Sequence, residues 1–434
     1  MDEALAALLA QARPLASAAA ETEEVNTLDA YGRVLAVPVQ SLIDVPPMDN
    51  TAMDGYAMRA ADVSVPGARL KVTQRIPAGY VGETLLPGTA ARIFTGAMLP
   101  AGADAVVMQE QCSTEKRTEG DFVNVNHVPA AGEWVRKRGD DIRAGSTILT
   151  AGTRLTPQAC GLAASVGMQS LTVMRRLKVA VFFTGDELAM PGEPLKPGAI
   201  YNSNRFMLRG LIEALGCALT DFGIVRDTLE ETRATLRAAA REHDLIITTG
   251  GVSVGEEDHV RPAVEAEGRI DLWQIAIKPG KPLAHGRVRR SDVTNDGKSG
   301  EPGDGHVGDG KTGAQLDEQH GEADFIGLPG NPVSAFVTFL LFVRPFILKC
   351  QGVQATTPHA LQLTADFDWP KPDRRREFLR ARMTDGGTLE LFPNQSSGVL
   401  TSTVWGDGLI DNPAGQAIKR GDRVRFLPFA ELLN

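Results

Sequence analysis

Two stretches of this chain of 434 residues decide its fold, KVAVFFTGDEL at residues 178–188 and DLIITTGG at 244–251. Each begins with a short run of apolar, β-branched and aromatic residues that stops at glycine, a pattern typical of a buried strand. Between them lie the helix-like FMLRGLIEALG (206–216), the strand-like TDFGIVRD (220–227) and a helix-like pattern at 229–243. Strands that alternate with helices form βαβ units, so we expect a doubly wound α/β domain with a parallel sheet.

Smaller domains are expected to flank this α/β layer. The predicted divisions are an N-terminal linker or dimerisation domain at 1–40 and 143–175, a small β domain at 41–142, the α/β domain at 176–352, and a C-terminal β domain at 358–434. Residues 2–37 are predicted to be helical with a break at Pro14, and a further helix is expected at 157–166. The chain is therefore predicted to be multidomain, α/β plus β.

The end of the α/β domain contains an unusual insertion. LWQIAIK (272–278) and DFIGLPG (324–330) are predicted strands, and a helix is expected to begin near Val333. Between the two strands, residues 291–323 are rich in Gly and Asp and nearly free of large apolar side chains. Such a composition cannot offset its ordering entropy, so we expect a flexible surface insertion.

The charge balance excludes several classes of protein. Lys and Arg number 45 against 54 Asp and Glu, a formal net charge of -9, whereas nucleic acids and anionic membranes are held by clustered basic residues. No nucleic-acid or membrane partner is therefore expected, and any phosphate chemistry must be local. The longest strongly apolar run, 333–343, ends at Arg344 and is too short to span a bilayer.

The cysteines and the N-terminus indicate a cytoplasmic protein. Four cysteines lie far apart without a C-x-x-C pair: Cys112, Cys160, Cys217 and Cys350. This spacing fits neither a disulfide framework nor a zinc cluster, and it favours a reducing compartment. The first residues are acidic and lack the basic region of a secretory signal.

Polar residues follow the predicted strands, at the sheet edge where α/β proteins bind ligands. Gly250 and Gly251 come between a strand and a helix, where free backbone N–H groups and the positive helix end can hold a phosphate. The same glycines could simply form a tight turn. Lys278 and Lys281 could add positive charge for a phosphate or another oxyanion.

Four acidic residues are expected at the same edge: Asp186, Glu187, Asp227 and Asp258. Carboxylates gathered in one place repel one another unless a cation lies among them. Mg²⁺ prefers such hard oxygen ligands together with substrate phosphates, which makes it the expected cofactor. Taken singly, each acid could instead be a helix N-cap or a surface charge.

A rival interpretation rests on residues 251–255, which match G-x-S-x-G between a strand and a helix. Ser253 would then be the nucleophile of a serine hydrolase, with His285 as its base. No HGGG-type loop precedes the serine, and the acidic residues 256–258 would disfavour a developing oxyanion. The hydrolase remains an alternative to a phosphate-handling enzyme.

Several motifs together resemble one family, the molybdopterin molybdenumtransferases, which include the C-terminal domain of gephyrin. In the family's order they are PPMDNTAMDGYA (46–57), RIFTGAMLPAGADAVVMQE (92–110), RGDDIRAG (138–145), FFTGDEL (182–188), TTGGVSVGEEDH (248–259), IKPGKP (277–282) and GLPGNPVSA (327–335). The resemblance runs from about residue 30 to the C-terminus. It implies an elongated homodimer of four-domain subunits, with each active site between the α/β domain of one subunit and the small β domain of the other.

The resemblance also implies a reaction and roles for residues. Adenylylated molybdopterin and molybdate would bind, the adenylate would be hydrolysed with Mg²⁺ assistance, and molybdenum would enter the dithiolene. The implied catalytic residues are Asp54, Asp141, Glu187, Asp227, Asp258 and Lys278, with Glu187, Asp227 and Asp258 as metal ligands. The implied substrate-binding residues are Thr95, Asp186, Gly250, Gly251, Ser253, Lys281, Pro329, Asn331, Pro332, Ser334, Arg380 and Ser397. Asp54, Thr95 and Asp141 would come from the second subunit.

The sequence departs from the family's pattern at two places, and two other functions are alternatives to the implied reaction. Gln274 stands where family members often carry a basic residue, and the 291–323 insertion is unusual. A molybdopterin adenylyltransferase would resemble the α/β domain alone, so the flanking domains argue against that activity. A scaffolding role would need an exposed apolar groove, which the sequence does not identify. The adenylyltransferase and molybdoenzyme-maturation proteins are candidate partners.

Overall fold

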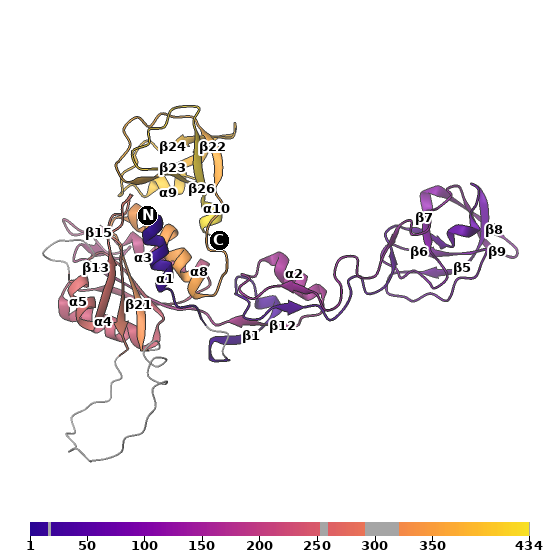
Figure 1. Ribbon diagram of the computed structural model, residues 1–434, viewed down its shortest axis with the longest axis horizontal. Helices are drawn as coiled ribbons and strands as arrows, with labels where there is room; N and C mark the ends of the chain where they lie inside the picture. Colours follow the sequence, from indigo (N-terminus) through magenta and orange to yellow (C-terminus); the bar gives the residue numbers. More distant parts are fainter. Residues whose placement is uncertain (16–18, 252–258, 291–320, 434) are drawn as a thin grey trace, which may run out of the picture. The chain divides into compact units, whose positions relative to one another are not determined.

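The computed structural model describes residues 1–15, 19–251, 259–290 and 321–433. Contacts divide the chain into two units. The first comprises residues 1–23, 32–36 and 173–434, and the second comprises 24–31 and 37–172. The first unit holds the α/β domain and the C-terminal β domain, and the second holds the small β domain (Figure 1).

The α/β domain is built on a six-stranded sheet of order β16-β13-β17-β21-β20-β18. The strands are β16 (Ala218–Val225), β13 (Lys178–Thr184), β17 (Leu245–Thr249), β21 (Glu322–Leu328), β20 (Ala284–Arg289) and β18 (Gly268–Trp273). The first four are parallel, which confirms the doubly wound layer, whereas β20 and β18 are antiparallel and make the sheet mixed. The strand β21 also takes the last residues of the stretch predicted as a loop to residue 323.

Alternate residues of β13 face two separate apolar cores. Val179, Val181 and Phe183 pack with α3 (Ser203–Ala214) and α7 (Pro332–Thr338). Ala180 and Phe182 pack on the other face with α4 (Leu229–Glu242) and α5 (Val260–Glu267). Because both faces are covered, the strand reads as a continuous apolar run, and each buried Phe contributes about 1.5–3 kcal/mol.

The helix that was predicted to begin near Val333 begins at Pro332. From Pro332 the chain runs through α7, a π-helical turn (Phe339–Val343) and α8 (Arg344–Cys350) without a break. Pro345 is tolerated because the π turn before it already departs from the α-helical hydrogen-bond ladder. The resulting 19-residue helix is long and apolar enough to cross a membrane, but 94% of its apolar window is buried inside the protein, so we regard it as a core helix.

The helical prediction for residues 2–37 is correct only at its start. The helix α1 (Asp2–Gln11) packs into the α/β core through Leu8, although the sequence assigned this segment to the linker domain. Further along, β1 (Thr22–Asn26) is a strand rather than a helix. Its Thr22 and Val25 are β-branched, and β-branched side chains favour extended backbone.

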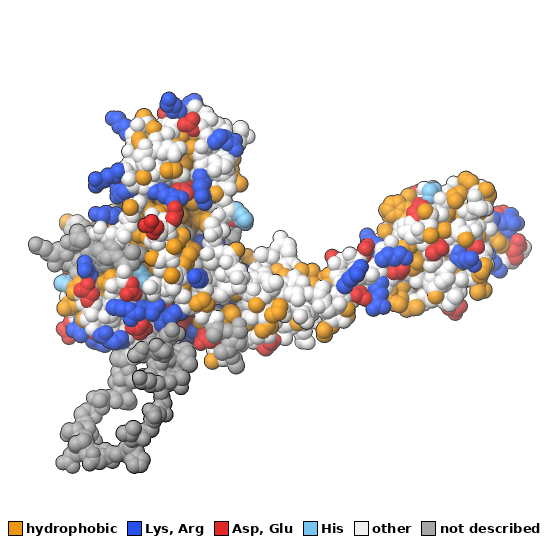
Figure 2. All heavy atoms as spheres, in the orientation of Figure 1, with side chains coloured by type: hydrophobic (Ala, Val, Ile, Leu, Met, Phe, Trp, Pro, Cys, Tyr) orange, Lys and Arg blue, Asp and Glu red, His pale blue; other side chains and the backbone are white. Residues whose placement is uncertain are grey.

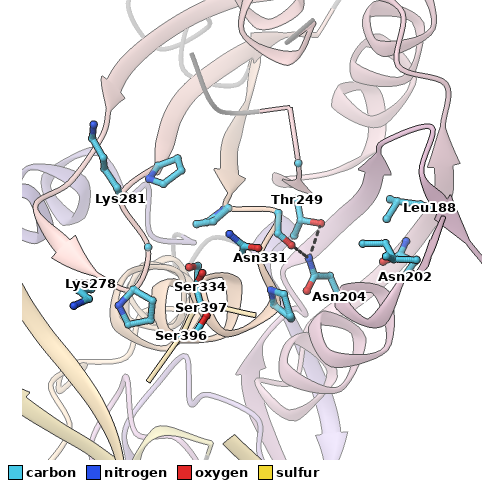
Figure 3. Close-up of a pocket in the computed structure, with 18 of the residues that line it drawn as sticks. Leu188, Asn202, Asn204, Thr249, Lys278, Lys281, Asn331, Ser334, Ser396 and Ser397 are labelled. Carbon is cyan, nitrogen blue, oxygen red and sulfur yellow. Dashed lines mark hydrogen bonds between the residues drawn. The ribbon is translucent and has the colours of Figure 1, made fainter. Parts of the chain in front are cut away.

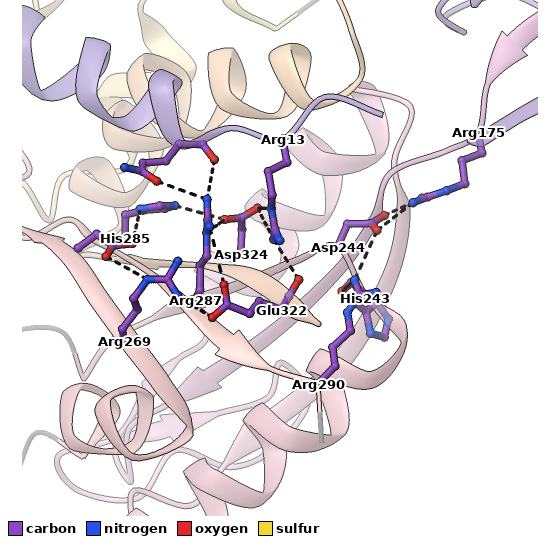
Figure 4. Close-up of polar contacts among 12 residues, drawn as sticks. Arg13, Arg175, His243, Asp244, Arg269, His285, Arg287, Arg290, Glu322 and Asp324 are labelled. Carbon is purple, nitrogen blue, oxygen red and sulfur yellow. Dashed lines mark hydrogen bonds and ion pairs between the residues drawn. The ribbon is translucent and has the colours of Figure 1, made fainter. Parts of the chain in front are cut away.

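Ion pairs anchor the N-terminal segment at the amino ends of the parallel strands (Figure 4). Arg13 Nη2 lies 2.9 Å from Asp324 Oδ2, and the buried His285 lies beside the same carboxylate. Burial raises the pKa of Asp324, but the neighbouring His285 and the charge of Arg13 outweigh it and hold that pKa below its usual value. Arg175 pairs with Asp244 at 2.7 Å next to this cluster.

The predicted strand 272–278 is in fact divided between two sheets. Gln274 has a φ of +113°, a conformation that side-chain-bearing residues rarely adopt, and it ends β18. Its backbone N–H donates to the carbonyl oxygen of Leu283, which closes a loop. The following β19 (Ile277–Lys278) then pairs with β23 (Arg376–Met383) of the C-terminal domain.

The C-terminal domain is a β domain, as predicted, with a six-stranded sheet of order β19-β23-β24-β22-β26-β25. Its own strands are β23, β24 (Thr388–Leu391), β22 (Leu361–Ala365), β26 (Arg423–Pro428) and β25 (Gly408–Asn412). The helices α9 (Thr401–Trp405) and α10 (Phe429–Leu432) complete it. Phe429 joins the core of the α/β domain, so these two domains share apolar packing.

The second unit holds a six-stranded sheet of order β7-β4-β6-β5-β9-β8. Its strands are β7 (Ala105–Met108), β4 (Gly55–Met58), β6 (Thr89–Ile93), β5 (Ala68–Ile76), β9 (Gly120–Val125) and β8 (Cys112–Arg117). The short runs between Gly and Pro therefore form the small β domain that the sequence predicted. The helix α2 (Pro157–Ser165) also forms as predicted, with Thr156 as its N-cap and Pro157 in its first turn.

Candidate active site

The carboxyl ends of β13, β17 and β21 meet closely at one edge of the sheet. Thr249 of β17 lies opposite Phe183 of β13 and Leu328 of β21. Gly250 follows with a φ of +87°, and a Cβ at this position would lie 2.6 Å from the carbonyl oxygen of Thr184. Only glycine fits both the conformation and the approach. The absence of a side chain at Gly250 therefore allows the ends of β17 and β13 to lie this close together.

A cavity of about 720 Å³ opens over this edge, a volume typical of small-molecule sites. The structure brings nine of the predicted site residues to its lining: Glu187, Gly250, Lys278, Lys281, Pro329, Asn331, Pro332, Ser334 and Ser397 (Figure 3). They come from the ends of several strands and from the C-terminal domain. The sequence thus located the cavity by the rule that ligands bind beyond the carboxyl ends of parallel strands.

The C-terminal domain supplies one wall through the loop at residues 395–397. The carbonyl oxygen of Ser397 accepts a hydrogen bond of 3.0 Å from the backbone N–H of Val333, in the first turn of α7. First-turn N–H groups lack partners within their own helix, so this bond fixes the loop against the helix start. Ser396 and Ser397 consequently lie at the cavity beside Ser334 (Figure 3).

The charged groups of the lining are mainly cationic. They are Lys278, Lys281, Arg375 and the single carboxylate Glu187. Lys278 Nζ lies 3.3 Å from Oε1 of the buried Glu377, and Arg375 forms a bidentate pair with Asp373. The Lys281 ammonium group has no ion-pair partner in the part of the chain that the structure describes. Lys278 Nζ also lies 3.5 Å from Asp373 Oδ2, so among the described residues Lys281 contributes the least compensated positive charge of this lining. Elsewhere acidic and basic side chains are interspersed on the face shown in Figure 2.

Of the three predicted metal ligands, Glu187 lines the cavity, Asp227 does not, and Asp258 is not described. Glu187 folds back toward the backbone, since a Cβ on Gly185 would lie 2.6 Å from its carboxylate. Asp227 follows β16 and does not line the cavity, and neither does the exposed Asp186. Asp258 lies outside the described residues, as does Ser253. Within the described ranges, no three His, Cys, Asp or Glu side chains lie close enough together to hold a metal ion.

The glycine turn differs in part from the prediction. Gly250 lines the cavity and Gly251 does not. Both have positive φ, but the next described helix, α5, begins only at Val260. The helices whose first turns do reach the cavity are α3 and α7, through Asn204 and through Ser334. The positive helix ends at this site therefore come from α3 and α7.

Arg380 does not reach the cavity, contrary to the expectation that it faces molybdate or phosphate. Its guanidinium is fully buried and donates to Ser402 Oγ and to the carbonyl oxygens of Phe378 and Ser396. Burial lowers the pKa of Arg380 to about 10, which still leaves it protonated at neutral pH. Since Ser396 lines the cavity, Arg380 acts on the site by holding the loop 395–397.

Several polar residues of the cavity were not among the predicted site residues. They are Thr184, Asn202, Asn204, Thr249, Arg375, Gln395 and Ser396. Asn202 is the N-cap of α3, where its side chain accepts a hydrogen bond from the backbone N–H of Arg205. A signal was present, because Asn before an amphipathic pattern is typical of a helix start. It was overlooked because α3 follows the short β15 (Ile200–Tyr201) and not a strand of the main sheet.

In the second unit, Asp54 and Thr95 form one cluster. Asp54 Oδ1 accepts hydrogen bonds from the backbone N–H of Thr95 at 2.8 Å and from its hydroxyl at 2.7 Å. These two bonds lower the pKa of Asp54. Asp141 is exposed on a different loop of the same domain, where its backbone N–H donates to the carbonyl oxygen of Val45.

Two further expectations concern His285 and Gln274. His285 is buried among Asp271, Asp324 and Phe346 and does not line the cavity, so the base proposed for a serine hydrolase is absent from this site. Gln274 is exposed at the loop between β18 and β19 and also lies outside the lining. Its lack of charge therefore does not alter the cationic wall directly.

Comparisons with known proteins agree along the whole chain. Residues 1–167 match the model of the MoeA N-terminal region (domain I and II), 180–349 match a probable molybdopterin binding domain, and 362–429 match the MoeA C-terminal region (domain IV). A molybdopterin molybdenumtransferase of Haemophilus influenzae is 37% identical over 95% of both chains. A molybdopterin molybdenumtransferase 2 of Mycobacterium tuberculosis is 35% identical over 90% of both.

A solved structure shows the same fold. The molybdopterin biosynthesis moeA protein of Pyrococcus horikoshii OT3 superposes with a TM-score of 0.79 at 28% identity and covers 98% of both chains. The sheet order, the cavity at its carboxyl edge and these matches lead to one conclusion. The chain belongs to the molybdopterin molybdenumtransferase family.

Proposed function

We propose that the protein transfers molybdenum from molybdate into adenylylated molybdopterin, with hydrolysis of the adenylate and release of AMP. The observation that carries this proposal is the cavity at the carboxyl edge of the sheet, which combines a cationic wall with two helix starts. The proposed substrates are a molybdate dianion and a phosphate-linked pterin, both of which need such local positive charge. The two family members named above carry the corresponding activity in their names.

The chain's own residues would bind and orient the substrates. Lys281, whose charge is not neutralised by a described partner, would attract the oxyanion. The first turn of α7, with Ser334 in its lining, would donate hydrogen bonds to it. An adenylylated pterin contains a pyrophosphate, and a water molecule that attacks one phosphorus would release AMP and leave molybdopterin with its remaining phosphate.

We propose that Mg²⁺ binds to the protein together with the substrate. The described residues do not provide a complete metal site. Mg²⁺ commonly takes only one or two carboxylates and completes its shell with phosphate oxygens and water, and Glu187, which lines the cavity, is our candidate for one of those carboxylates. When bound, the ion would neutralise charge on the pyrophosphate oxygens.

We further propose that the working form is a homodimer in the cytoplasm. Asp54 and Thr95 belong to one contact unit and the cavity belongs to the other, which is compatible with a site completed by Asp54, Thr95 and Asp141 of the partner subunit. The four free cysteines suit a reducing compartment. The molybdopterin adenylyltransferase, which would supply the substrate, is a candidate partner, as are the proteins that mature molybdoenzymes.

Activity is tested by cofactor formation. The purified protein with Mg²⁺, molybdate and adenylylated molybdopterin should form cofactor that activates an apo-molybdoenzyme. Omission of either molybdate or Mg²⁺ should abolish that activation. Full activation without Mg²⁺ would remove the ion from the proposal, and no activation under any condition would refute the activity itself.

The shared site is tested by mixing two inactive variants, Asp54→Ala and Glu187→Ala. In a randomly mixed homodimer, half the dimers combine one subunit of each kind, and each of these would contain one intact site if the sites span subunits. The mixture should therefore recover about a quarter of the wild-type activity. If each site lies within one subunit, mixing restores nothing, and the dimeric site is wrong.

A further inference from the structure

Three buried side chains that line the cavity carry polar atoms without partners. Thr184, Asn202 and Asn204 are 3%, 2% and 7% exposed, and all three line the cavity. In the described part of the chain, Thr184 Oγ1, Asn202 Nδ2 and Asn204 Oδ1 have no hydrogen-bond partner. Buried polar atoms are almost always paired in native proteins, so these atoms point to a ligand that pairs with them.

The orientation of both amides is fixed by their other contacts. Asn202 Oδ1 accepts from the backbone N–H of Arg205 at 3.1 Å, which leaves its Nδ2 as the unpaired donor. Asn204 Nδ2 donates to the carbonyl oxygen of Gly330 at 2.8 Å, and a flipped amide would set two oxygens against each other there. Asn204 Oδ1 is therefore an unpaired acceptor. The site offers one donor and one acceptor from the start of α3.

These amides lie apart from the cationic wall. In Figure 3, Lys278 and Lys281 lie at one side of the cavity, whereas Asn202 and Leu188 lie at the other. The lysines thus lie at one side of the cavity, and the other side, which we call the amide side, presents the uncharged amide of Asn202 beside Leu188, which follows Glu187 in the chain. A matching ligand has an anionic group at one end and a neutral heterocycle with adjacent donors and acceptors at the other.

We propose that Asn202 and Asn204 recognise the pyrimidine edge of the pterin. That edge carries a 4-oxo acceptor, which Asn202 Nδ2 can reach with its N–H, and a 2-amino donor, which Asn204 Oδ1 can accept. The Thr184 hydroxyl can serve a ring nitrogen as either donor or acceptor. This inference rests on the proposed function, because it assigns the amide side of the same cavity to the pterin and leaves the side with Lys278 and Lys281 to the oxyanions.

The test is Asn202→Asp, with pterin fluorescence as the measure of binding. Aspartate keeps the oxygen that caps α3 and is as good an N-cap as asparagine, so the fold should be retained, as circular dichroism would check. It replaces the donor Nδ2 by an anionic oxygen that repels the 4-oxo group. Pterin affinity should fall by about 10- to 100-fold, since a site built to hydrogen-bond its ligand discriminates strongly once a group is left unpaired.

Two controls isolate the effect. Asn26→Asp makes the same substitution at another capping asparagine, which is exposed and bonds the backbone N–H of Leu28, and it should bind pterin like the wild type. Lumazine replaces the 2-amino group of pterin by a second carbonyl. It should bind the wild type about tenfold more weakly than pterin, because Asn204 Oδ1 would face another oxygen.

The outcomes separate this inference from the proposed function. If Asn202→Asp binds pterin within about twofold of the wild type, or if the wild type binds pterin and lumazine equally or binds neither, the assignment is overturned. Cofactor formation by the wild type is measured on the same preparation. Normal cofactor formation with unchanged pterin binding in Asn202→Asp would sink the assignment alone, whereas selective pterin binding without cofactor formation would sink the proposed activity alone.

Discussion

Gly250→Ala tests whether the cavity depends on the close meeting of the strand ends. Gly250 and Gly198 share a φ of +87°, but a Cβ would meet the Thr184 carbonyl oxygen at 2.6 Å in the first and nothing within 4 Å in the second. Alanine in this left-handed conformation costs roughly 1–2 kcal/mol at either position. Overpacking against the backbone adds about 1–3 kcal/mol at Gly250 alone. Gly250→Ala should therefore cost about 2–5 kcal/mol and Gly198→Ala about 1–2 kcal/mol.

The assay is hydrogen exchange of the amides in β13 and β17, followed by mass spectrometry, together with cofactor formation. Exchange at the ends of both strands should accelerate in Gly250→Ala and stay near the wild-type rate in Gly198→Ala. Cofactor formation should fall only in Gly250→Ala, because the displaced strand ends are part of the cavity. Equal exchange and equal activity in the two variants would refute the reasoning.

Three further predictions address charge and position. Lys281→Gln should weaken molybdate binding about tenfold, or about 1.4 kcal/mol, whereas Lys116→Gln in the other unit should leave the affinity unchanged. Titration calorimetry measures both affinities, and equal affinities of the two variants would contradict the role of Lys281. Arg380→Met should leave the Ser396 carbonyl oxygen unpaired, at a cost of about 1–3 kcal/mol, and should speed amide hydrogen exchange at residues 395–397. Unchanged amide exchange would contradict the positioning role of Arg380. Because the pKa of Asp324 is lowered in the folded protein, its ionised form stabilises the fold above the unfolded-state pKa, and this stabilisation is lost as pH falls through the folded-state pKa. Arg13→Gln should therefore move acid unfolding to higher pH, as followed by circular dichroism. An unchanged midpoint of acid unfolding would argue against the ion pair.

The parallel core of the α/β domain was predictable because its strands are buried on both faces. Residues 178–184 and 245–249 read as apolar runs that stop at glycine, and the rule for parallel sheets then located the cavity. The split at Gln274 was not predictable, because the apolar run continues past it. What divides the run is a positive φ and a pairing with β23, which follows about a hundred residues later.

Side-chain contacts explain two differences between the predicted site residues and the cavity lining. The resemblance implied that Arg380 binds substrate, but its guanidinium is buried in the C-terminal domain and held there by Ser402 and two carbonyl groups. Asn202 and Asn204 looked like ordinary helix-start residues. The role that we propose for them depends on which atoms remain unpaired after folding, and only the three-dimensional contacts determine that.

The stoichiometry of a single turnover tests the central claim most directly. With protein in excess over adenylylated molybdopterin, AMP released and molybdenum bound to the pterin would be measured in the same reaction, with and without molybdate. We expect one AMP for each molybdenum incorporated, and little AMP when molybdate is omitted. AMP release at the same rate and extent without molybdate, with no molybdenum on the pterin, would contradict the proposed transfer.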